Sequence, residues 1–235
     1  MASEKNVPVR RSSHKDIDAF LSAAARVPAL GQVRGRLIFA VDATMSRQPT
    51  WDRAAEIQSG MFEVAQSIGG LAVQLVFFRG HGEFEASEWT TTPSALGARM
   101  NRVTCRSGFT QLCRVLDHTA QEAKRTPVGA LVYVGDCFEE RPEDAAKRAG
   151  ELALRGVPAF MFHEGDDPQA AQAFKEVARL TRGVYARFDS GAARQLRDLL
   201  RAAAVYAAGG DVALREYGEK MGGEVLLLAR RMRGE

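Results

Sequence analysis

Short apolar runs alternate with longer stretches of helical period between residues 36 and 188. The runs read RLIFAVD, LAVQLVFF, ALVYVGD, VPAFMFH and VYARF. Strands that alternate along the chain with amphipathic helices form a mostly parallel sheet, in which the helices make the crossover connections. The pattern therefore predicts an α/β fold with a doubly wound, Rossmann-like sheet and helices on both of its faces.

One pair of strands breaks this alternation. The runs LAVQLVFF and EFEASEW are separated only by RGHG. A short turn that contains glycine joins two antiparallel strands into a hairpin. We therefore expect a mostly parallel six-stranded sheet whose third strand runs antiparallel near one edge.

The helix after the first run has signals at both of its ends. Thr50 can act as the N-cap, and Asp52 suits the positive end of the helix dipole. Gly69 and Gly70 can end the helix. Its apolar face is predicted to consist of Ile57, Met61, Val64, Ala65 and Ile68. Further helices are expected over residues 93–103, 110–125, 142–155, 168–182 and 191–208.

The predicted sheet and its helices occupy residues 35–208, and one segment lies on each side of them. Residues 1–34 are interpreted as an N-terminal tail with a helix, since residues 14–30 carry apolar side chains at helical spacing. Residues 209–235 are interpreted as a C-terminal helical extension that includes the apolar patch VLLL. We expect both segments to pack on the domain.

Composition narrows the class of protein. The chain has 235 residues, 46% of them apolar, which suits a soluble globular protein. The net charge is +3 and the basic residues are scattered, so nucleic acid is not the expected partner. No apolar run reaches the roughly 18 residues of a membrane span. Three cysteines without C-x-x-C spacing favour a reducing compartment, so a cytoplasmic location is the expectation.

Oxygen-bearing side chains stand where the predicted strands end. In an open parallel sheet the carboxyl ends of the strands converge on one crevice. Asp42, Thr44 and Ser46 leave the first strand at alternate positions, which in extended backbone directs them to one side. Oxygen ligands alone suit a hard cation such as Mg²⁺ or Mn²⁺. The other strand ends are Asp136, His163 with Glu164, and Asp189.

Three motifs together resemble a known family. D-x-T-x-S at 42–46, SGFTQL at 107–112 and VYVGD at 132–136 are similar to the three loops of a von Willebrand factor type A (VWA) domain, and the resemblance covers about residues 35–208. In that family the loops form the metal ion-dependent adhesion site (MIDAS). The resemblance implies that the metal ligands are Asp42, Thr44, Ser46, Thr110 and Asp136, the hydroxyls directly and the acids directly or through water.

The motifs depart from the family pattern at three positions. Thr44 stands where serine is commoner, but it keeps a hydroxyl group. Phe109 stands where glycine usually precedes the threonine of the second loop, and Cys137 stands where glycine often follows the acid of the third. Bulk at these two positions could narrow the approach of a partner or restrict loop motion.

The resemblance also implies a function. Two carboxylates balance a divalent cation, and the remaining protein ligands are neutral hydroxyls, so the metal retains affinity for one more anionic oxygen. In the family that oxygen belongs to a Glu or Asp of a partner protein, and the metal acts as a bridge and not as a catalyst. Intracellular bacterial members often work beside AAA-type ATPases or within larger assemblies, and we expect this chain to be a stand-alone VWA-like domain of that kind. The oligomeric state stays open.

Two alternative functions remain beside this one. The chain could be a structural or assembly module of the same fold with a degenerate metal site. It could also be a metal-dependent hydrolase or phosphoryl-transfer enzyme with Asp42 as nucleophile. The sequence argues against the enzyme, because Thr44 stands where a second acid is expected and neither a phosphate-binding G-x-x-x-x-G-K-[ST] loop nor a G-x-S-x-G motif is present.

Several charged or reactive side chains near the same face have two interpretations. Cys137 with His163 could be a thiol nucleophile with its base, although a cysteine at a strand end is more often a small buried side chain.

An acidic group near this face could select a basic partner surface around the bridging carboxylate, or could consist of solvated loop charges and helix N-terminal acids. Its members are Glu139, Glu140, Glu164, Asp166 and Asp167.

Overall fold

The computed structural model describes residues 35–66, 68–188 and 193–232. The chain divides into two compact units, Met1–Gln32 and Val33–Glu235, and all of the described residues belong to the second. The helix expected within residues 14–30, the N-terminal segment 1–34 and the strand-end residue Asp189 lie outside the described residues.

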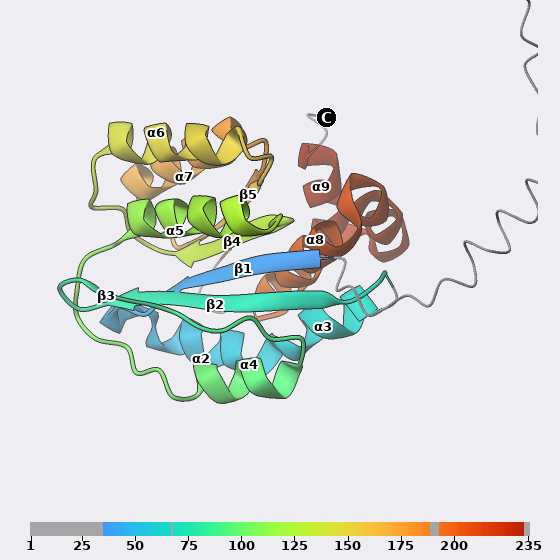
Figure 1. The fold of residues 1–235 in the computed structure, drawn as a ribbon, viewed down its shortest axis with the longest axis horizontal. Coiled ribbons are helices and arrows are strands. Elements are labelled where there is room, and N and C mark those ends of the chain that lie inside the picture. Colours follow the sequence, from blue (N-terminus) through green and yellow to red (C-terminus); the bar gives the residue numbers. More distant parts are fainter. Residues whose placement is uncertain (1–34, 67, 189–192, 233–235) are drawn as a thin grey trace, which may run out of the picture. The chain divides into compact units, whose positions relative to one another are not determined.

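A six-stranded sheet forms the centre of the second unit (Figure 1). Its strands lie in the order β3-β2-β1-β4-β5-β6. All neighbouring pairs are parallel except β2 with β3, which confirms the antiparallel edge strand expected from the RGHG turn. The strands are β1 (Gly35–Asp42), β2 (Leu71–Arg79), β3 (Glu83–Ala86), β4 (Ala130–Gly135), β5 (Ala159–Glu164) and β6 (Val184–Phe188).

Helices cover both faces of the sheet, as Figure 1 shows, so the predicted fold class is confirmed. One layer contains α5 (Leu112–Arg125), α6 (Pro142–Ala153) and α7 (Pro168–Leu180). The other contains α2 (Gln48–Ile57), α3 (Ser59–Gln66), α4 (Pro93–Met100), α8 (Ala193–Met221) and α9 (Gly223–Met232). Along β1, Phe39 and Val41 are buried in the apolar cluster of the layer that contains α8, while Ile38 and Ala40 are buried in that of the layer that contains α5. Burial on both faces explains why the central strands read as continuous apolar runs.

The prediction of one helix capped by Thr50 is wrong. A short 3₁₀ helix, η1 (Met45–Arg47), leads directly into α2, whose N-cap position is Arg47, and the helical stretch is interrupted at Gln58 before α3 begins. Thr50 lies inside α2 and is buried, and its hydroxyl donates to the carboxylate of Glu164. A long-range side-chain partner therefore replaces the local capping interaction that the sequence favoured.

The last predicted helix forms the first segment of α8, whose described residues begin at Ala193. Helix α8 continues to Met221, but Gly210 has φ 70° and ψ −162°, so a second helical segment follows a kink just beyond the predicted end at residue 208. Beyond it, Leu214, Val225 and Leu228 are buried in the same core as the sheet. The division into 35–208 and 209–235 stays a prediction. Within the described ranges, no helix combines the length and the apolar character that a membrane crossing requires.

Candidate metal centre

The candidate ligands lie where the strand order reverses. The chain winds from β1 towards β2 and β3 on one side of the sheet, and from β4 towards β5 and β6 on the other. A crevice forms outside the carboxyl ends of two strands that are separated in this way. Asp42 is the last residue of β1, and Asp136 follows the last residue of β4. Val41 of β1 pairs with Val134 of β4. Asp42 is one residue beyond this pair and Asp136 is two residues beyond it, so the two acids follow their strands at nearly the same height along the sheet.

All five predicted ligands lie around one pocket at this position. Its volume is about 250 Å³. The lining residues are Asp42, Thr44, Met45, Ser46, Ser107, Gly108, Thr110, Asp136, Cys137 and Glu139. The structure therefore brings together side chains from three loops that are up to 94 positions apart, namely residues 42 to 136. That these side chains bind a metal stays a prediction.

A chain of oxygen atoms connects the first and third loops. The backbone N–H of Thr44 donates to Asp42 Oδ1 at 2.7 Å, which turns the chain at the end of β1. Thr44 Oγ1 and Ser46 Oγ are 3.4 Å apart, and Ser46 Oγ donates to Asp136 Oδ2 at 2.9 Å. The alternate spacing of the D-x-T-x-S motif thus places three oxygen-bearing side chains on one side of the loop, as expected.

The second loop is held by a reciprocal pair of hydrogen bonds and by a close backbone contact. The Thr110 N–H donates to Glu139 Oε2 at 3.1 Å, and the Glu139 N–H donates to Thr110 Oγ1 at 3.0 Å. Gly108 packs so closely on the hairpin turn that a Cβ atom there would lie 2.1 Å from the carbonyl oxygen of Gly80. These contacts fix Thr110 beside the third loop.

The donor atoms fit a divalent cation. Asp42 Oδ2 and Asp136 Oδ1 are buried and have no hydrogen-bond partner among the described residues. Burial raises the pKa of Asp42 to about 6, against the opposing effect of the hydrogen bond from Thr44. Buried carboxylate oxygens need a cation or a donor to offset their desolvation. The pocket offers two acids and three hydroxyls, a set of hard ligands that suits Mg²⁺ or Mn²⁺.

Acidic and thiol groups alone do not make a metal site here. In the described part of the chain, no group of three or more His, Cys, Asp or Glu side chains could hold a metal ion. Glu139 lines the same pocket as the two aspartates, but its carboxylate is engaged by the Thr110 N–H. Any metal bound here would therefore depend on the hydroxyls of Thr44, Ser46 and Thr110.

The two bulky departures from the family motif leave the pocket open. The side chain of Phe109 is 58% exposed and is not among the lining residues, and its ring centroid lies 5.6 Å from that of His81. Cys137 lines the pocket but is exposed. Neither side chain closes the space above Asp42 and Asp136.

The acidic group near this face separates into members with different roles. Glu140 accepts hydrogen bonds from the Cys113 N–H in the first turn of α5, and Asp167 caps α7 by accepting from the Ala170 N–H. These two are helix N-terminal acids, which confirms that interpretation for them. For Glu164 both interpretations are wrong, because this residue is buried and paired with Arg47.

The thiol and imidazole at the strand ends do not form a nucleophile with its base. His163 is buried, and its Nδ1 lies 2.8 Å from the hydroxyl of Tyr185. Although Cys137 is exposed as a residue, partial desolvation of its thiol raises the pKa of that group, an effect that Asp136 strengthens. A thiol that stays protonated near neutral pH is a weak nucleophile. The thiol–imidazole interpretation is therefore not supported.

Arg47 is the residue at this site that sequence reasoning missed. It is 1% exposed, and burial lowers the pKa of its guanidinium while Asp136 and Asp42 oppose that effect. An arginine after the D-x-T-x-S motif, and an acid that ends the apolar run of β5, were the available signals. Nothing local indicated that these two side chains would meet.

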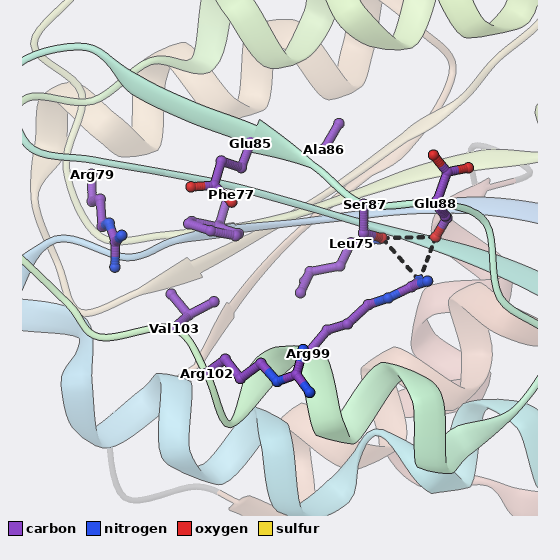
Figure 2. Close-up of a pocket in the computed structure, with 10 residues that line it drawn as sticks. All are labelled: Leu75, Phe77, Arg79, Glu85, Ala86, Ser87, Glu88, Arg99, Arg102 and Val103. Carbon is purple, nitrogen blue, oxygen red and sulfur yellow. Dashed lines mark hydrogen bonds between the residues drawn. The ribbon is translucent and has the colours of Figure 1, made fainter.

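A second and larger pocket lies away from the candidate metal centre, between β2, β3 and α4 (Figure 2). Its volume is about 370 Å³, and it shares no lining residue with the first pocket. Figure 2 shows Arg99 reaching from α4 to Ser87 and the carbonyl oxygen of Glu88. Since arginine and glutamate side chains line it together, its charge does not favour one class of ligand.

The strand order, the reversed edge strand and the crevice above β1 and β4 define the fold of a VWA domain. The structure is similar to that of the SpRpn10 VWA domain, with 13% sequence identity, a TM-score of 0.55, and 76% of this chain and 98% of that chain covered. It is also similar to proximal thread matrix protein 1 from the mussel byssus with a zinc-occupied MIDAS motif, with 13% identity, a TM-score of 0.55, and 83% and 53% covered.

A third similar structure is the pilus adhesin SpaC from Lactobacillus rhamnosus GG in an open conformation. It shows 10% identity and a TM-score of 0.54, with 73% of this chain and 30% of that chain covered. This chain therefore spans about half of the mussel protein and less than a third of the adhesin. No protein-family model and no curated protein matches the sequence. At these identities the likeness establishes the fold.

Proposed function

We propose that this chain is a divalent-metal-dependent protein–protein interaction module. Mg²⁺ or Mn²⁺ would be held by the five candidate ligands, and a Glu or Asp carboxylate of a partner protein would complete the coordination. The observation that carries the proposal is the pair of buried carboxylate oxygens, Asp42 Oδ2 and Asp136 Oδ1, which lack a described partner in a pocket lined by hydroxyls. The ligand set is Asp42, Thr44, Ser46, Thr110 and Asp136.

The charge of the ligand set explains why a partner carboxylate would bind. A divalent cation in this pocket would supply an electrophilic centre, because only two of its five protein ligands are charged. Neutral hydroxyls reduce the charge of the cation less than carboxylates do. The zinc-occupied MIDAS of the similar mussel protein supports a divalent ion on this fold. Ligands that are all oxygen favour Mg²⁺ or Mn²⁺ over zinc for this chain.

Exposed apolar side chains beside the pocket support a protein as the partner. Met45 lines the pocket, and Phe109 stands between two residues that line it, Gly108 and Thr110. Met45 and Phe109 are each 58% exposed. Methionine and aromatic residues are enriched in the centres of protein interfaces. The partner class that we infer from the sequence resemblance is an AAA-type ATPase or a larger assembly.

We further infer that the chain has no catalytic activity and works in the cytoplasm. The imidazole of His163 has the hydroxyl of Tyr185 as its partner, and the pKa of the Cys137 thiol is raised, so this pair does not support a nucleophile with its base. The free cysteines Cys105, Cys113 and Cys137 suit a reducing compartment. Metal-dependent turnover of a generic phosphoester that is lost in Asp42→Ala would contradict the first of these inferences.

Thermal unfolding with and without metal tests the proposal. At 100 times its dissociation constant, Mg²⁺ should stabilise the wild-type protein by about 2.7 kcal/mol. Asp42→Ala should abolish this gain, whereas Asp166→Ala, which removes an exposed acid outside the pocket, should retain it. Binding of a glutamate-containing peptide should require Mg²⁺ and be lost in EDTA. Equal peptide binding in both buffers would contradict the proposal.

An assembly module with a degenerate metal site is the second candidate. The exposed apolar side chains of Val212, Met221 and Leu227 on α8 and α9 favour it, because they offer contacts that do not involve a metal. Identical unfolding temperatures in Mg²⁺, Mn²⁺ and EDTA would support this function over the first. Self-association that is lost on replacing these three side chains by serine would then identify the contact surface.

A further inference from the structure

A buried ion pair lies beside the candidate metal centre. Arg47 ends η1, directly after the ligand Ser46, and is 1% exposed. Its Nη1 contacts the carboxylate of Glu164 at the end of β5, 117 positions away, and the hydroxyl of Thr50 donates to the same carboxylate. The first metal loop is therefore tied to the far side of the crevice by a charged pair that is shielded from water.

Arg47 also lies within the electrostatic reach of the two candidate acidic ligands. The carboxylates of Asp136 and Asp42 exert the largest charge effects on its guanidinium. The group thus contains three carboxylates, those of Asp42, Asp136 and Glu164, and one buried guanidinium, which remains protonated in proteins. Glu139 also lines the pocket, but it is an exposed residue whose charge is screened by water and salt. Three negative charges and one positive charge give a net charge of −2 at neutral pH. One divalent cation neutralises that charge.

Unpaired donors and acceptors both remain in this group. Arg47 Nε and Nη2 are buried without a hydrogen-bond partner among the described residues, and so are Asp42 Oδ2 and Asp136 Oδ1. The guanidinium is bound to Glu164 and leaves these two carboxylate oxygens available. Glu164 therefore holds the positive charge close enough to affect the acids electrostatically without occupying their free oxygens.

We propose that Arg47 and Glu164 are positioning residues of the candidate metal centre. Together they keep its net charge at −2, which one divalent cation neutralises. Neither side chain is a metal ligand. The pair would hold the first loop in place and favour divalent over trivalent ions, since uncompensated charge is costly away from water. This inference rests on the proposed metal site and adds the residues that decide which ionic charge the site accepts.

A charge cycle tests the inference. Glu164→Gln changes the net charge of the group to −1, Arg47→Met changes it to −3, and the double variant Arg47→Met/Glu164→Gln restores −2. The dissociation constants of Mn²⁺ and Tb³⁺ are measured for each protein by electron paramagnetic resonance and by luminescence. Their ratio is the readout, because a loss of stability alone would not change the preference for ionic charge.

The expected results follow from the sign of each charge. Glu164→Gln should weaken Mn²⁺ binding about tenfold and Tb³⁺ binding more, since buried charges interact strongly at low dielectric. Arg47→Met should shift the preference about tenfold towards Tb³⁺ by the same argument. The double variant should return the ratio to that of the wild type. The exposed pair Arg179 and Glu176 on α7 supplies matched control variants with the same charge changes.

Arg47→Met leaves the charge of Glu164 buried without its partner and could prevent folding. The double variant removes both charges of the pair, so it tests the inference even if the single variant does not fold. An unchanged Mn²⁺ to Tb³⁺ ratio in Glu164→Gln, or a double variant that does not return to the wild-type ratio, would overturn the inference. In that case metal binding by the wild-type protein would leave the proposed function intact. Absence of metal binding by the wild-type protein would overturn both.

Discussion

Asp42 has the most costly environment of the candidate ligands when no cation is present. It is fully buried, and burial raises its pKa to about 6 from an ordinary value of 3.8. Thr44 offsets part of this cost through one backbone hydrogen bond, and only one of the two carboxylate oxygens receives a partner. The residue is therefore tuned towards binding a cation at the expense of the metal-free protein.

Asp42→Asn should separate these two effects. In EDTA at pH 8 the variant should be more stable than the wild type by up to about 3 kcal/mol, since each pKa unit corresponds to 1.36 kcal/mol. With Mg²⁺ the wild type should gain stability and the variant should not. Chemical denaturation in both buffers measures the difference, with Asp166→Asn as the exposed control. A variant that is less stable in EDTA would contradict the prediction.

The same carboxyl group predicts a pH dependence. The pKa of Asp42 is higher in the folded state than in the unfolded state, so the folded state binds more protons between pH 4 and 6. The stability of the metal-free protein should therefore fall as pH rises through this window and then level off above pH 6. Denaturation midpoints of wild type and Asp42→Asn, recorded in EDTA across this range, should diverge as pH rises.

Loops at the ends of the strands, and not the strands themselves, decide whether the ligands meet. The second loop reaches the first by hydrogen bonding from the Arg106 N–H to the Ala43 carbonyl, and reaches the hairpin turn through Gly108. The apolar runs and the glycine-containing turn predicted the described strands, because these signals lie within the strands and the turn themselves. The sequence predicted the start of α2 wrongly, because Thr50 bonds to Glu164, which is distant in sequence.

Gly108→Ala should displace the second loop while leaving the helices intact. The added Cβ would meet the backbone of Gly80, which cannot move as a side chain can. We expect a loss of about 1 to 3 kcal/mol, typical of overpacking, and at least a tenfold loss of Mn²⁺ affinity as Thr110 moves. Gly150→Ala in α6 is the control, because its Cβ has open space and should stabilise the helix by up to about 1 kcal/mol.

At the scale of the whole molecule, the C-terminal helices contribute to the core of the sheet domain. Val225 and Leu228 of α9 are buried in the same apolar cluster as β1 and α8. The C-terminal segment thus packs on the domain through its apolar patch, as the sequence led us to expect. An extension that only recruits a partner would leave these side chains exposed.

Leu228→Ala should therefore destabilise the whole domain. A buried leucine replaced by alanine costs about 2 to 5 kcal/mol, because apolar contacts are lost and a cavity remains. Leu227→Ala removes a neighbouring side chain that is 45% exposed and should change stability by less than about 0.5 kcal/mol. Thermal unfolding of the two variants measures the contrast. Equal stabilities would show that α9 is independent of the domain.

The sequence by itself determined the order of the elements, the antiparallel edge strand and the residue types of the candidate ligands. These features follow from local periodicity and from side-chain chemistry at the ends of apolar runs. Only the tertiary structure decided that Glu164 is a buried partner of Arg47 and not part of an acidic partner-binding surface, and that Phe109 is exposed and does not line the pocket. Burial and ion pairing depend on which distant segments meet, and no local pattern carries that information.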